Sequence, residues 1–399
     1  MTEVELSPTA MAAGGAALAR DDGGRVVFVE GALPGERVRA RLTDMRKDFA
    51  RAVALEILEP SPDRVAPPCP ALAMGCGGCT WQHVSSPGQS RLKADVVVDA
   101  LRRIGKLAEP PRPQPAPMAG PPLRTTARLA VSPGGRAGHR PRTGSGAVET
   151  EACLVAHPLL EELIVDGRYP GAREVLLRAS VATGERIVLV DRAAGAVRVP
   201  TGVPVFQEGD TRRAFMHEEV AGRRFRISAG SFFQAGPEVA AALASAVTSS
   251  IGEALPDGGV LVDAYAGVGL FASVIAAQRR ARVVAVENDP SAVADARVNL
   301  ADLDAHVVGV EVARWRPQPA DVVVADPARS GLGRPGVGAV TATGASRVVL
   351  VSCDPASLAR DSVLLREAGY ALVSVLLVDA FPHTFHVETV SRFDLMAAP

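Results

Sequence analysis

The cysteine at position 353 is the first candidate for covalent chemistry, because it comes two residues after a short apolar run at 348–351. Such a run is typical of a strand buried on both faces of a parallel sheet. Ligands of an open α/β sheet bind outside the carboxyl ends of its strands, so Cys353 would face a binding crevice. A thiolate there could act as a nucleophile. The alternative is an apolar plug, because free cysteine is often buried, and this segment alone favours the plug.

Four titratable residues gather further along, in the run DAFPHTFHVE at 379–388. They are Asp379, His383, His386 and Glu388. A loop of this composition is what general acid–base catalysis requires. For the two histidines we prefer local hydrogen bonds that shape the loop.

The other cysteines are unevenly spread: Cys69, Cys76 and Cys79 are crowded in one loop, and Cys153 stands alone. In a reducing cytosol such a cluster indicates a metal site rather than disulfides. Four thiolates could hold a tetrahedral zinc ion or a 4Fe-4S cluster. Zinc sites usually pair two C-x2-4-C knuckles, and the second is missing here. An iron–sulfur cluster is therefore favoured, with zinc as the alternative. For His83 we prefer local packing to metal ligation.

The elements that must position Cys353 alternate between strand and helix patterns from residue 259 onwards, which predicts a doubly wound parallel sheet. After its first strand, the glycines Gly267 and Gly269 let a ligand approach the backbone. Glu287 ends the second strand, where it could accept hydrogen bonds from a ribose. The third glycine of the dinucleotide fingerprint is absent, which disfavours a nicotinamide cofactor. The loop and the acid suit S-adenosylmethionine as well as NAD.

The fourth strand ends in Asp326, followed by Pro-Ala-Arg329. Methyltransferases acting on amino groups tend to place Pro-Pro-aromatic here, and an arginine is unsuited to stacking a base. Cytosine-5 RNA methyltransferases place a cysteine after this strand, and this chain has none there. Its nucleophile candidate follows the fifth strand instead.

Residues 1–59 indicate a small β-barrel of the oligonucleotide-binding kind, with strands at 25–29, 37–42 and 50–58. Arg37, Arg39 and Arg41 alternate, which places them on one strand face. Together with Phe49 and Arg51, this cationic face suits phosphate contact and base stacking. The alternative is an ordinary solvated edge strand. The segment resembles a TRAM domain, an RNA-binding barrel.

Residues 60–235 hold the cysteine loop, an amphipathic helix at 88–105, a proline-rich linker at 107–122 and a β-rich domain that brings Cys153 near the loop. Its arginines, Arg124, Arg128, Arg140 and Arg142, could add RNA contacts. A helix beginning near Pro237 opens the catalytic domain, 236–399.

The whole chain has 399 residues and a formal net charge of −1, which leaves room for two or three domains. This charge argues against a nucleic-acid coat over the whole surface but allows a local basic stripe. There is no stretch of 18 apolar residues and no signal-peptide pattern at the N-terminus. We expect a soluble, cytoplasmic protein without a membrane partner.

Taken together, these motifs resemble the iron–sulfur, TRAM-bearing RNA (uracil-5-)-methyltransferases, which make 5-methyluridine in ribosomal or transfer RNA. The resemblance runs from end to end of the chain: the TRAM-like barrel, CGGCTWQH at 76–83, GSFFQ at 230–234, DAYAGVG at 263–269, DPARSGLG at 326–333, VSCDPASLARD at 351–361 and DAFPHTFHVE. It departs from the family's pattern in having six residues between Cys69 and Cys76 where five are usual, and Asp354 where the family has an asparagine.

The resemblance implies a class I Rossmann-like S-adenosylmethionine methyltransferase domain behind a TRAM barrel and a central β-rich domain. It makes Cys353 the nucleophile and Glu388 the base. The methyl donor would be bound by Gln234, Tyr265, Gly267, Glu287 and Asp326, and the cluster by Cys69, Cys76, Cys79 and Cys153. The expected substrate is a uridine in 23S rRNA, and the expected unit is a monomer. The alternatives are the same reaction on tRNA, or a non-catalytic RNA-binding factor of the same fold.

That reaction needs both groups because uracil C5 is too weak a nucleophile to take a methyl group directly. Addition of a thiolate at C6 makes an enolate whose C5 attacks the sulfonium methyl. A base must then remove the C5 proton so that the thiolate can leave. The uridine must leave its stack to enter the pocket, where Phe233 and Gln234 could grip it.

Overall fold

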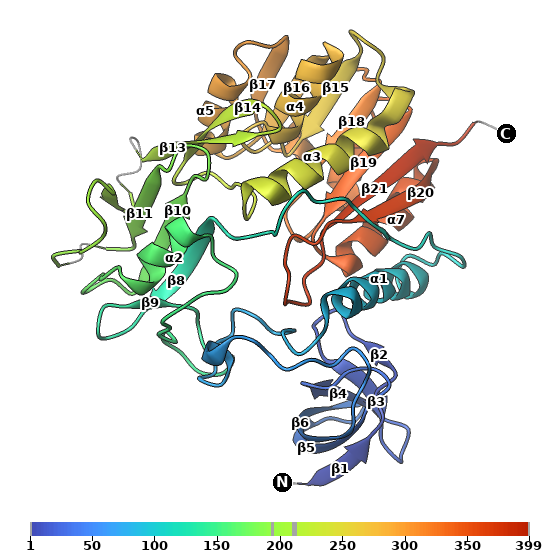
Figure 1. The fold of residues 1–399 in the computed structure, drawn as a ribbon. Coiled ribbons are helices and arrows are strands. Elements are labelled where there is room, and N and C mark those ends of the chain that lie inside the picture. Colours follow the sequence, from blue (N-terminus) through green and yellow to red (C-terminus); the bar gives the residue numbers. More distant parts are fainter. Residues whose placement is uncertain (1, 193–194, 210–213, 398–399) are drawn as a thin grey trace.

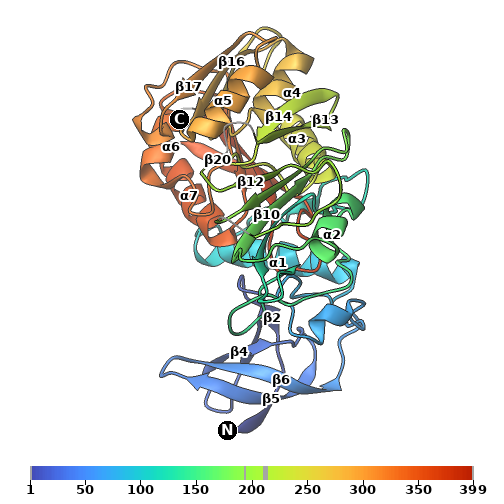
Figure 2. The ribbon, with the colours of Figure 1, turned by 90° about the vertical axis from the view of Figure 1, so that its left-hand side faces the viewer.

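The structure is a computed structural model that describes residues 2–192, 195–209 and 214–397. An N-terminal barrel lies at the bottom of Figure 1, an α/β domain at the top right, and a β-rich part at the left. The perpendicular view in Figure 2 again places the barrel at the end away from the α/β sheet. No helix in the described residues is long and apolar enough to cross a membrane.

The barrel is a six-stranded sheet with the strand order β1-β5-β6-β4-β3-β2. Its strands are β1 (Glu3–Leu6), β2 (Ala10–Met11), β3 (Ala17–Arg20), β4 (Val26–Glu30), β5 (Arg37–Met45) and β6 (Phe49–Glu59). Side chains alternate between core and solvent, as Val27 and Val29 of β4 are both fully buried. The three predicted strands are confirmed.

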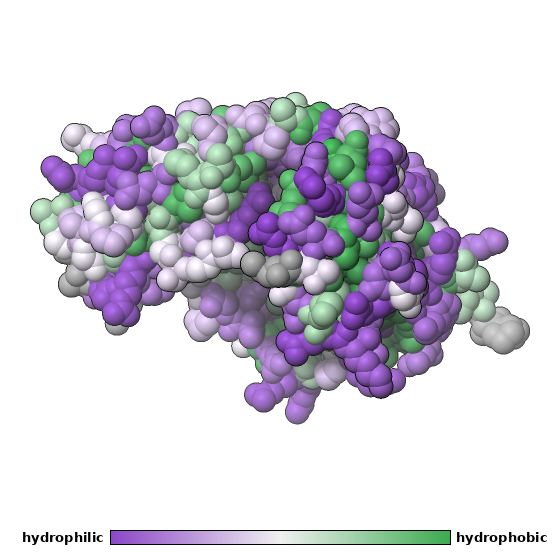
Figure 3. Space-filling view, turned by 90° about the horizontal axis from the view of Figure 1, so that it is seen from below, coloured by the Kyte–Doolittle hydropathy of each residue, from purple (hydrophilic) through white to green (hydrophobic). Residues whose placement is uncertain are grey.

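Arg37, Arg39 and Arg41 share one face of β5, as predicted, and each of them pairs with an acidic side chain. Arg37 pairs with Glu5 and Glu59 at 2.9 and 2.8 Å, and Arg39 pairs with Glu56. Arg41 lies 3.5 Å from Glu3. The antiparallel register of β1 with β5 places the glutamates of β1 opposite these arginines. Seen from the barrel end, hydrophilic residues cover most of the surface, with smaller apolar patches between them (Figure 3).

Helix α1 (Ser86–Arg103) connects the barrel to the α/β domain and confirms the predicted helix, beginning two residues earlier. The Ser85 side chain caps it by accepting a hydrogen bond from the Gly88 amide at 3.2 Å. Leu92 and Val96 pack in the barrel core, whereas Val97 and Leu101 pack in the core of the α/β domain. The helix therefore belongs to two cores at once.

Between these parts, η1 (Pro70–Leu72) lies in the cysteine loop, and the proline-rich segment contains β7 (Gln114–Pro115). Strand β7 pairs in parallel with β20 at the edge of the sheet of the α/β domain. The expected linker is thus extended and also attached to that sheet.

The central part is a five-stranded sheet with the order β12-β11-β10-β8-β9, followed by the hairpin β13–β14. Its elements are β8 (Thr126–Val131), β9 (Ala137–Gly138), α2 (Pro158–Val165), β10 (Glu174–Ala179), β11 (Arg186–Val190), β12 (Val205–Gln207), β13 (Phe215–Val220) and β14 (Arg223–Ser228). Helix α2 packs against β10, and Cys79 and Cys153 belong to this core.

The α/β domain has an eight-stranded sheet with the order β17-β16-β15-β18-β19-β21-β20-β7. Its elements are α3 (Pro237–Ile251), η2 (Gly252–Ala254), β15 (Val260–Ala264), α4 (Leu270–Arg279), β16 (Arg282–Glu287), α5 (Pro290–Asn299), β17 (Ala305–Gly309), η3 (Val312–Arg314), β18 (Val322–Ala325), α6 (Gly333–Thr341), β19 (Arg347–Ser352), α7 (Pro355–Glu367), β20 (Tyr370–Leu377) and β21 (Thr389–Leu395). The chain order reverses at β15–β18, and β21 runs antiparallel between β19 and β20. The predicted doubly wound sheet is confirmed.

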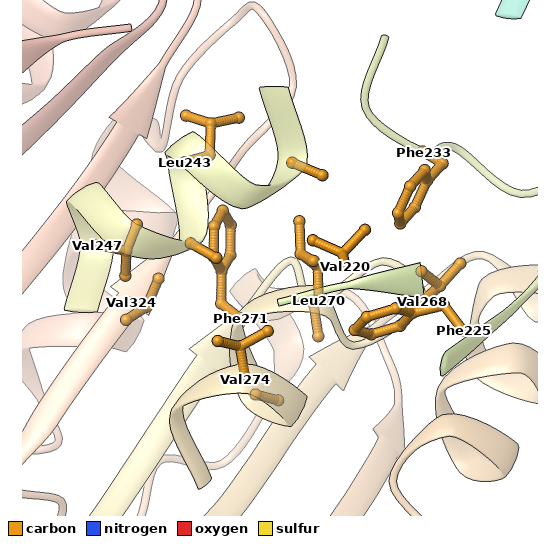
Figure 4. Close-up of a cluster of buried hydrophobic side chains, with 14 of the residues drawn as sticks. Val220, Phe225, Phe233, Leu243, Val247, Val268, Leu270, Phe271, Val274 and Val324 are labelled. Atoms are coloured by element: carbon orange, nitrogen blue, oxygen red, sulfur yellow. The ribbon is translucent and has the colours of Figure 1, made fainter. Parts of the chain in front are cut away.

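Both faces of this sheet are covered by apolar side chains. In β18, Val322 and Val324 face one core, and Val323 and Ala325 face the other. This double burial explains why the strands have uninterrupted apolar runs. Figure 4 shows one core, where Phe271 of α4 lies close to Val324, and Phe225 of the hairpin lies near Phe233. The hairpin is thus packed onto the α/β domain.

Candidate active site

Cys353 and Glu388 lie beside each other because of one strand register. In the antiparallel pair β19–β21, Ser352 is opposite Thr389. Cys353 follows the first of these residues and Glu388 precedes the second, so both leave the sheet at the same edge. The Thr389 hydroxyl fixes this edge by donating to the Ser352 carbonyl at 3.0 Å. The sheet therefore delivers a thiol and a carboxyl group to one place.

That edge opens into a cavity of about 760 Å³. Its lining includes every residue predicted for catalysis or for the methyl donor: Gln234, Tyr265, Gly267, Glu287, Asp326, Cys353 and Glu388. The cavity lies at the carboxyl ends of β15, β16, β18 and β19, next to the point where the strand order reverses, as expected for a ligand site in this kind of sheet.

The turn after β15 forms one wall of the cavity. Tyr265 and Gly267 both have left-handed backbones, with φ of 64° and 55°. The Gly267 amide donates to Glu287 at 2.8 Å, and the same carboxylate accepts from the amides of Asn288 and Asp289. Three backbone donors thus hold Glu287 in place at the cavity wall. A smaller adjoining cavity of about 350 Å³ shares Tyr265 and Glu287 with the first.

Burial and mutual repulsion raise the pKa values of the acidic groups in this cavity. Burial raises the pKa of Asp326 to about 7. Burial, together with the nearby Asp326, raises the pKa of Glu388 well above its ordinary value. The pKa of the Cys353 thiol rises to about 11 through burial, and then through Glu388 and Asp326, while Arg329 opposes the shift. The cavity therefore disfavours further negative charge and favours a cationic ligand.

The loop between β14 and α3 forms the opposite wall and carries GSFFQ. Phe233 is buried in the core of Figure 4, whereas Phe232 is 70% exposed at the cavity. The buried Asp295 of α5 holds this loop by accepting from the Ser228 amide at 2.7 Å and from the Ser231 hydroxyl at 2.6 Å. One aromatic ring anchors the loop, and the next is left free to contact a ligand.

Two residues, one in the cavity lining and one buried outside it, were not predicted from the sequence. Phe381 lies in the lining, and only the titratable groups of its run pointed to a site. Asp263 is fully buried beneath the glycine turn, where one carboxylate oxygen accepts from the Ala272 amide at 2.8 Å. Among the described residues the other oxygen has no hydrogen-bond partner, and burial raises the pKa of Asp263 to about 7. Only the first position of the DAYAGVG motif pointed to this acid.

The arginines predicted to add RNA contacts have different surroundings. Arg124 lines the cavity, beside Phe232 and Gln234 in its wall. Arg128 and Arg140 both pair with Glu174, at 2.7 and 2.9 Å. Arg142 donates to the Cys79 carbonyl at 3.4 Å. Arg124 is thus the arginine of this set that reaches the cavity.

The remaining cysteines lie outside this cavity, where the two segments that carry them are joined. Cys76 forms a β-bridge with Pro141, and the Gly77 amide donates to the Arg140 carbonyl at 3.0 Å. Cys79 and Cys153 share the apolar core of the central part. Burial, with smaller contributions from the neighbouring Cys79 and Cys76, raises the pKa of the Cys153 thiol to about 11.

The described residues contain no group of three or more His, Cys, Asp and Glu arranged to hold a metal ion. His139, which the sequence did not indicate, has its Nε2 3.8 Å from the Cys153 sulfur. His83 is buried, and burial lowers its pKa to about 4.

Comparison with known proteins gives three findings. Residues 3–55 match the model of the TRAM domain. An uncharacterized RNA methyltransferase of Streptomyces avermitilis is 35% identical, over 98% of this chain and 97% of that protein. A 23S rRNA (uracil(1939)-C(5))-methyltransferase of Aeromonas salmonicida is 30% identical, over 93% and 92% of the two chains.

One solved structure is similar over nearly the full length. The tRNA (uracil-54, C5)-methyltransferase of Pyrococcus abyssi, in complex with S-adenosyl-L-homocysteine, has a TM-score of 0.74 and 22% identity, covering 98% of this chain and 100% of its own. This similarity confirms the arrangement of barrel, central part and α/β domain.

Proposed function

Since the chain belongs to the RNA methyltransferase family that includes the 23S rRNA uracil-C5-methyltransferases, we propose that it transfers a methyl group from S-adenosylmethionine to C5 of a uridine in 23S rRNA. The observation that carries this proposal is the single cavity in which Cys353, Glu388 and the glycine turn of β15 meet. A thiol and a carboxyl group beside a donor site are the groups that methylation at C5 requires.

In the proposed mechanism, the Cys353 thiol and the Glu388 carboxyl group release their protons to water when the donor binds. The Cys353 sulfur then bonds to C6 of the uracil, which places a negative charge on the C4 oxygen and C5. C5 then displaces the methyl group from the sulfonium, releasing S-adenosylhomocysteine. Glu388, ionised at this stage, takes the proton from C5. The C6–sulfur bond breaks, and the thiolate and 5-methyluridine are released.

The charges of the cavity support this order of events. Burial and the neighbouring acids raise the pKa of Cys353 to about 11 and that of Glu388 well above its ordinary value, which favours the protonated forms of both groups before the donor binds. A cationic sulfonium beside them stabilises their charged forms, because an opposite charge within a few ångströms favours ionisation. The methyl donor would therefore activate the thiol as well as supply the methyl group.

The donor would lie against the turn at Tyr265 and Gly267, with Glu287, Gln234 and Asp326 around it. Glu287 already accepts three backbone hydrogen bonds, which fixes its carboxylate for contact with a ribose. The target uridine would enter on the side of Phe232 and Arg124, where an exposed ring and a guanidinium line the opening. One chain supplies all these residues, which supports a monomer as the working unit.

Two variants test the roles of the reacting groups. We expect Cys353→Ala to abolish methylation while donor binding, measured by calorimetry, persists. We expect Glu388→Gln to accumulate a covalent protein–RNA adduct, visible as a retarded band on a denaturing gel, because the C5 proton can no longer leave. Loss of donor binding in the first variant, or full turnover by the second, would contradict the assignment.

The substrate is tested with the wild-type protein, a tritiated methyl donor, and protein-free 23S rRNA and bulk tRNA from a deletion strain. We expect label in 23S rRNA, recovered as 5-methyluridine. Label in tRNA alone would assign the same reaction to the alternative substrate. No transfer to either RNA would favour a non-catalytic RNA-binding factor of this fold.

We further propose that Cys69, Cys76, Cys79 and Cys153 hold a 4Fe-4S cluster. In its support, Cys76 bridges the loop at 69–79 to Pro141, and Cys79 and Cys153 share one apolar core. Burial raises the pKa values of Cys79 and Cys153, and the neighbouring cysteines add to both shifts. Cysteine thiolates are the ligands such clusters use. A bound cluster would join the loop at 69–79 to the central part. Zinc is the alternative occupant.

A further inference from the structure

The loop between β20 and β21 carries the proposed base, and residues far away in the sequence hold it. Glu388 ends this loop, and its carbonyl accepts from the Val378 amide at 2.8 Å, which closes the loop at its base. The residues between them form no regular element. Within the loop, the Thr384 hydroxyl donates to the Phe381 carbonyl at 2.9 Å, and other parts of the chain supply further contacts.

Helix α1 supplies the first set of contacts. Lys93 is 1% exposed, and its ammonium group donates to Asp379 at 2.7 Å and to the Phe381 carbonyl at 2.9 Å. Phe381 itself lines the catalytic cavity. Both hydrogen bonds of the buried Lys93 ammonium group go to this loop. They hold the loop firmly, because moving it away would leave a buried charge without hydrogen-bond partners.

A second contact restrains an unfavourable backbone conformation. His383 has a φ of 61°, which side chains with a Cβ rarely adopt. Its amide donates to Gln89 of α1 at 2.7 Å, and its carbonyl accepts from the Trp81 amide at 2.7 Å. Gln89 is itself held by donating to the Val84 carbonyl at 2.8 Å. Both backbone groups of the strained residue are thus bound from outside the loop.

The barrel makes the third contact, through the turn at Gly15. A Cβ added at Gly15 would lie 2.5 Å from the ring of Phe385, which belongs to the loop. The Trp81 indole donates to the Gly15 carbonyl at 3.0 Å. Phe385 also packs against the barrel core. The RNA-binding barrel therefore touches the loop that carries the base.

We propose that Lys93 and Gln89, together with the barrel turn at Gly15, are positioning residues for Glu388, so that docking of the barrel sets the geometry of the base. This inference rests on the proposed function. It predicts a selective defect in variants of these residues. Addition of the thiol and binding of the donor should continue, because the groups responsible lie on other elements. The proton transfer from C5 slows, and methylated covalent adduct accumulates.

The first experiment compares Lys93→Met with Arg103→Met. Both variants lose a cation of α1, but Arg103 is exposed and pairs with Asp99 of the same helix. Asp379 has a side chain that is 37% exposed, so water can replace the lost ammonium. We expect Lys93→Met to lower kcat by about tenfold to a hundredfold, since small misplacements of reacting groups have such effects. The KM values should be unchanged, adduct should accumulate, and Arg103→Met should match the wild type.

The second experiment tests the barrel contact with Gly15→Ala and Gly24→Ala. Both glycines lie in barrel turns with left-handed backbones, at φ of 87° and 79°. A Cβ at Gly24 meets nothing within 4 Å, whereas one at Gly15 displaces Phe385. Both variants should lose similar stability through backbone strain. We expect only Gly15→Ala to accumulate adduct.

Hydrogen–deuterium exchange of the peptide covering 378–388 provides a readout that does not depend on methylation. We expect faster exchange in Lys93→Met and Gly15→Ala, and unchanged exchange in the two controls. Wild-type kcat, no adduct and unchanged exchange in these variants would overturn the proposal. If Lys93→Met fails to fold, Asp379→Asn breaks the same ion pair and replaces it in both experiments. The expected results, and the results that would overturn the proposal, are the same for this variant. A wild-type protein that transfers no methyl group would instead overturn the proposed function, while the exchange result would still decide the positioning.

Discussion

At the scale of single residues, the surroundings of Cys353 oppose its ionisation in the free protein. Burial and two neighbouring acids raise the pKa of the thiol to about 11, and the Arg329 guanidinium opposes this. Arg329 also lies 3.5 Å from Asp354, the residue after the nucleophile. A thiol that stays protonated until a cationic donor binds is protected from oxidation and alkylation.

This protonation predicts an unusual pH dependence for alkylation of Cys353. The thiolate reacts, so the rate should continue to rise above pH 9, where an ordinary thiol levels off. Iodoacetamide labelling, followed by mass spectrometry of the peptide containing Cys353, measures this rate. In Arg329→Gln the rate at pH 8 should fall further, because the cation that lowers the pKa is lost. An alkylation rate that reaches a plateau below pH 9 would show that burial and the neighbouring acids do not raise the pKa of this thiol.

At the scale of elements, the loop carrying GSFFQ depends on one buried carboxylate of α5. Asp295 is fully buried and accepts from Ser228 and Ser231, and it pairs with Arg226 at 2.9 Å. Removing a carboxylate that accepts hydrogen bonds from several buried groups lowers the stability of the fold, because those donors are then left without partners. The position of Gln234 and Phe232 at the cavity thus depends on Asp295.

We expect Asp295→Ala to lower the free energy of unfolding by about 3 kcal/mol, the range for breaking a buried ion pair. Its KM for the methyl donor should also rise, since the loop forms a wall of the cavity. Urea denaturation and steady-state kinetics measure the two effects. Asp302→Ala is the matched control, because Asp302 pairs with Arg223 of the same hairpin but is 61% exposed. Equal effects from both variants would contradict the role of burial.

The parallel core of the α/β sheet was largely predictable, because β15, β16, β18 and β19 are mainly apolar runs and Glu287, Asp326 and Cys353 lie at or just after their ends. Cys353 and Glu388 were placed correctly in one cavity since both flank strand ends. The sequence could not show that Lys93 would pair with Asp379, 286 positions away. Nor could it show the glutamates opposite Arg39 and Arg41, because the register of β1 against β5 is a tertiary choice.

At the scale of the whole molecule, the cysteine loop is the segment between the barrel and the central part. If it holds the proposed cluster, we expect Cys153→Ser to lose iron and sulfide, because a direct ligand is removed. The loss should exceed the roughly tenfold to hundredfold drop in metal affinity that follows mutation of a residue hydrogen-bonded to a ligand. Anaerobic purification and metal analysis provide the measurement. Cys353→Ser should retain full iron, because that thiol lines the catalytic cavity. Zinc in place of iron in the wild-type protein would show that these cysteines form a zinc site and would contradict the 4Fe-4S proposal.

Among the barrel residues predicted to contact RNA, Arg51 differs from the arginines of β5. Arg51 lies over the rings of Phe28 and Phe49, at 5.8 and 6.0 Å from their centroids. Among the described residues it forms no ion pair, whereas Arg39 is neutralised by Glu56. An exposed cation beside two aromatic rings is suited to one phosphate contact and to stacking with an unpaired base.

We therefore expect Arg51→Ala to weaken binding of a 23S rRNA fragment and to reduce the salt dependence of affinity by about one phosphate contact. Phe49→Ala should cost about 1–3 kcal/mol of binding with the salt dependence unchanged, because stacking involves no counterion release. Arg39→Ala should leave both nearly unchanged, since its charge is already paired. Fluorescence titrations at several salt concentrations separate these outcomes. If Arg39→Ala weakened binding as much as Arg51→Ala, the paired face of β5 would be the RNA surface after all.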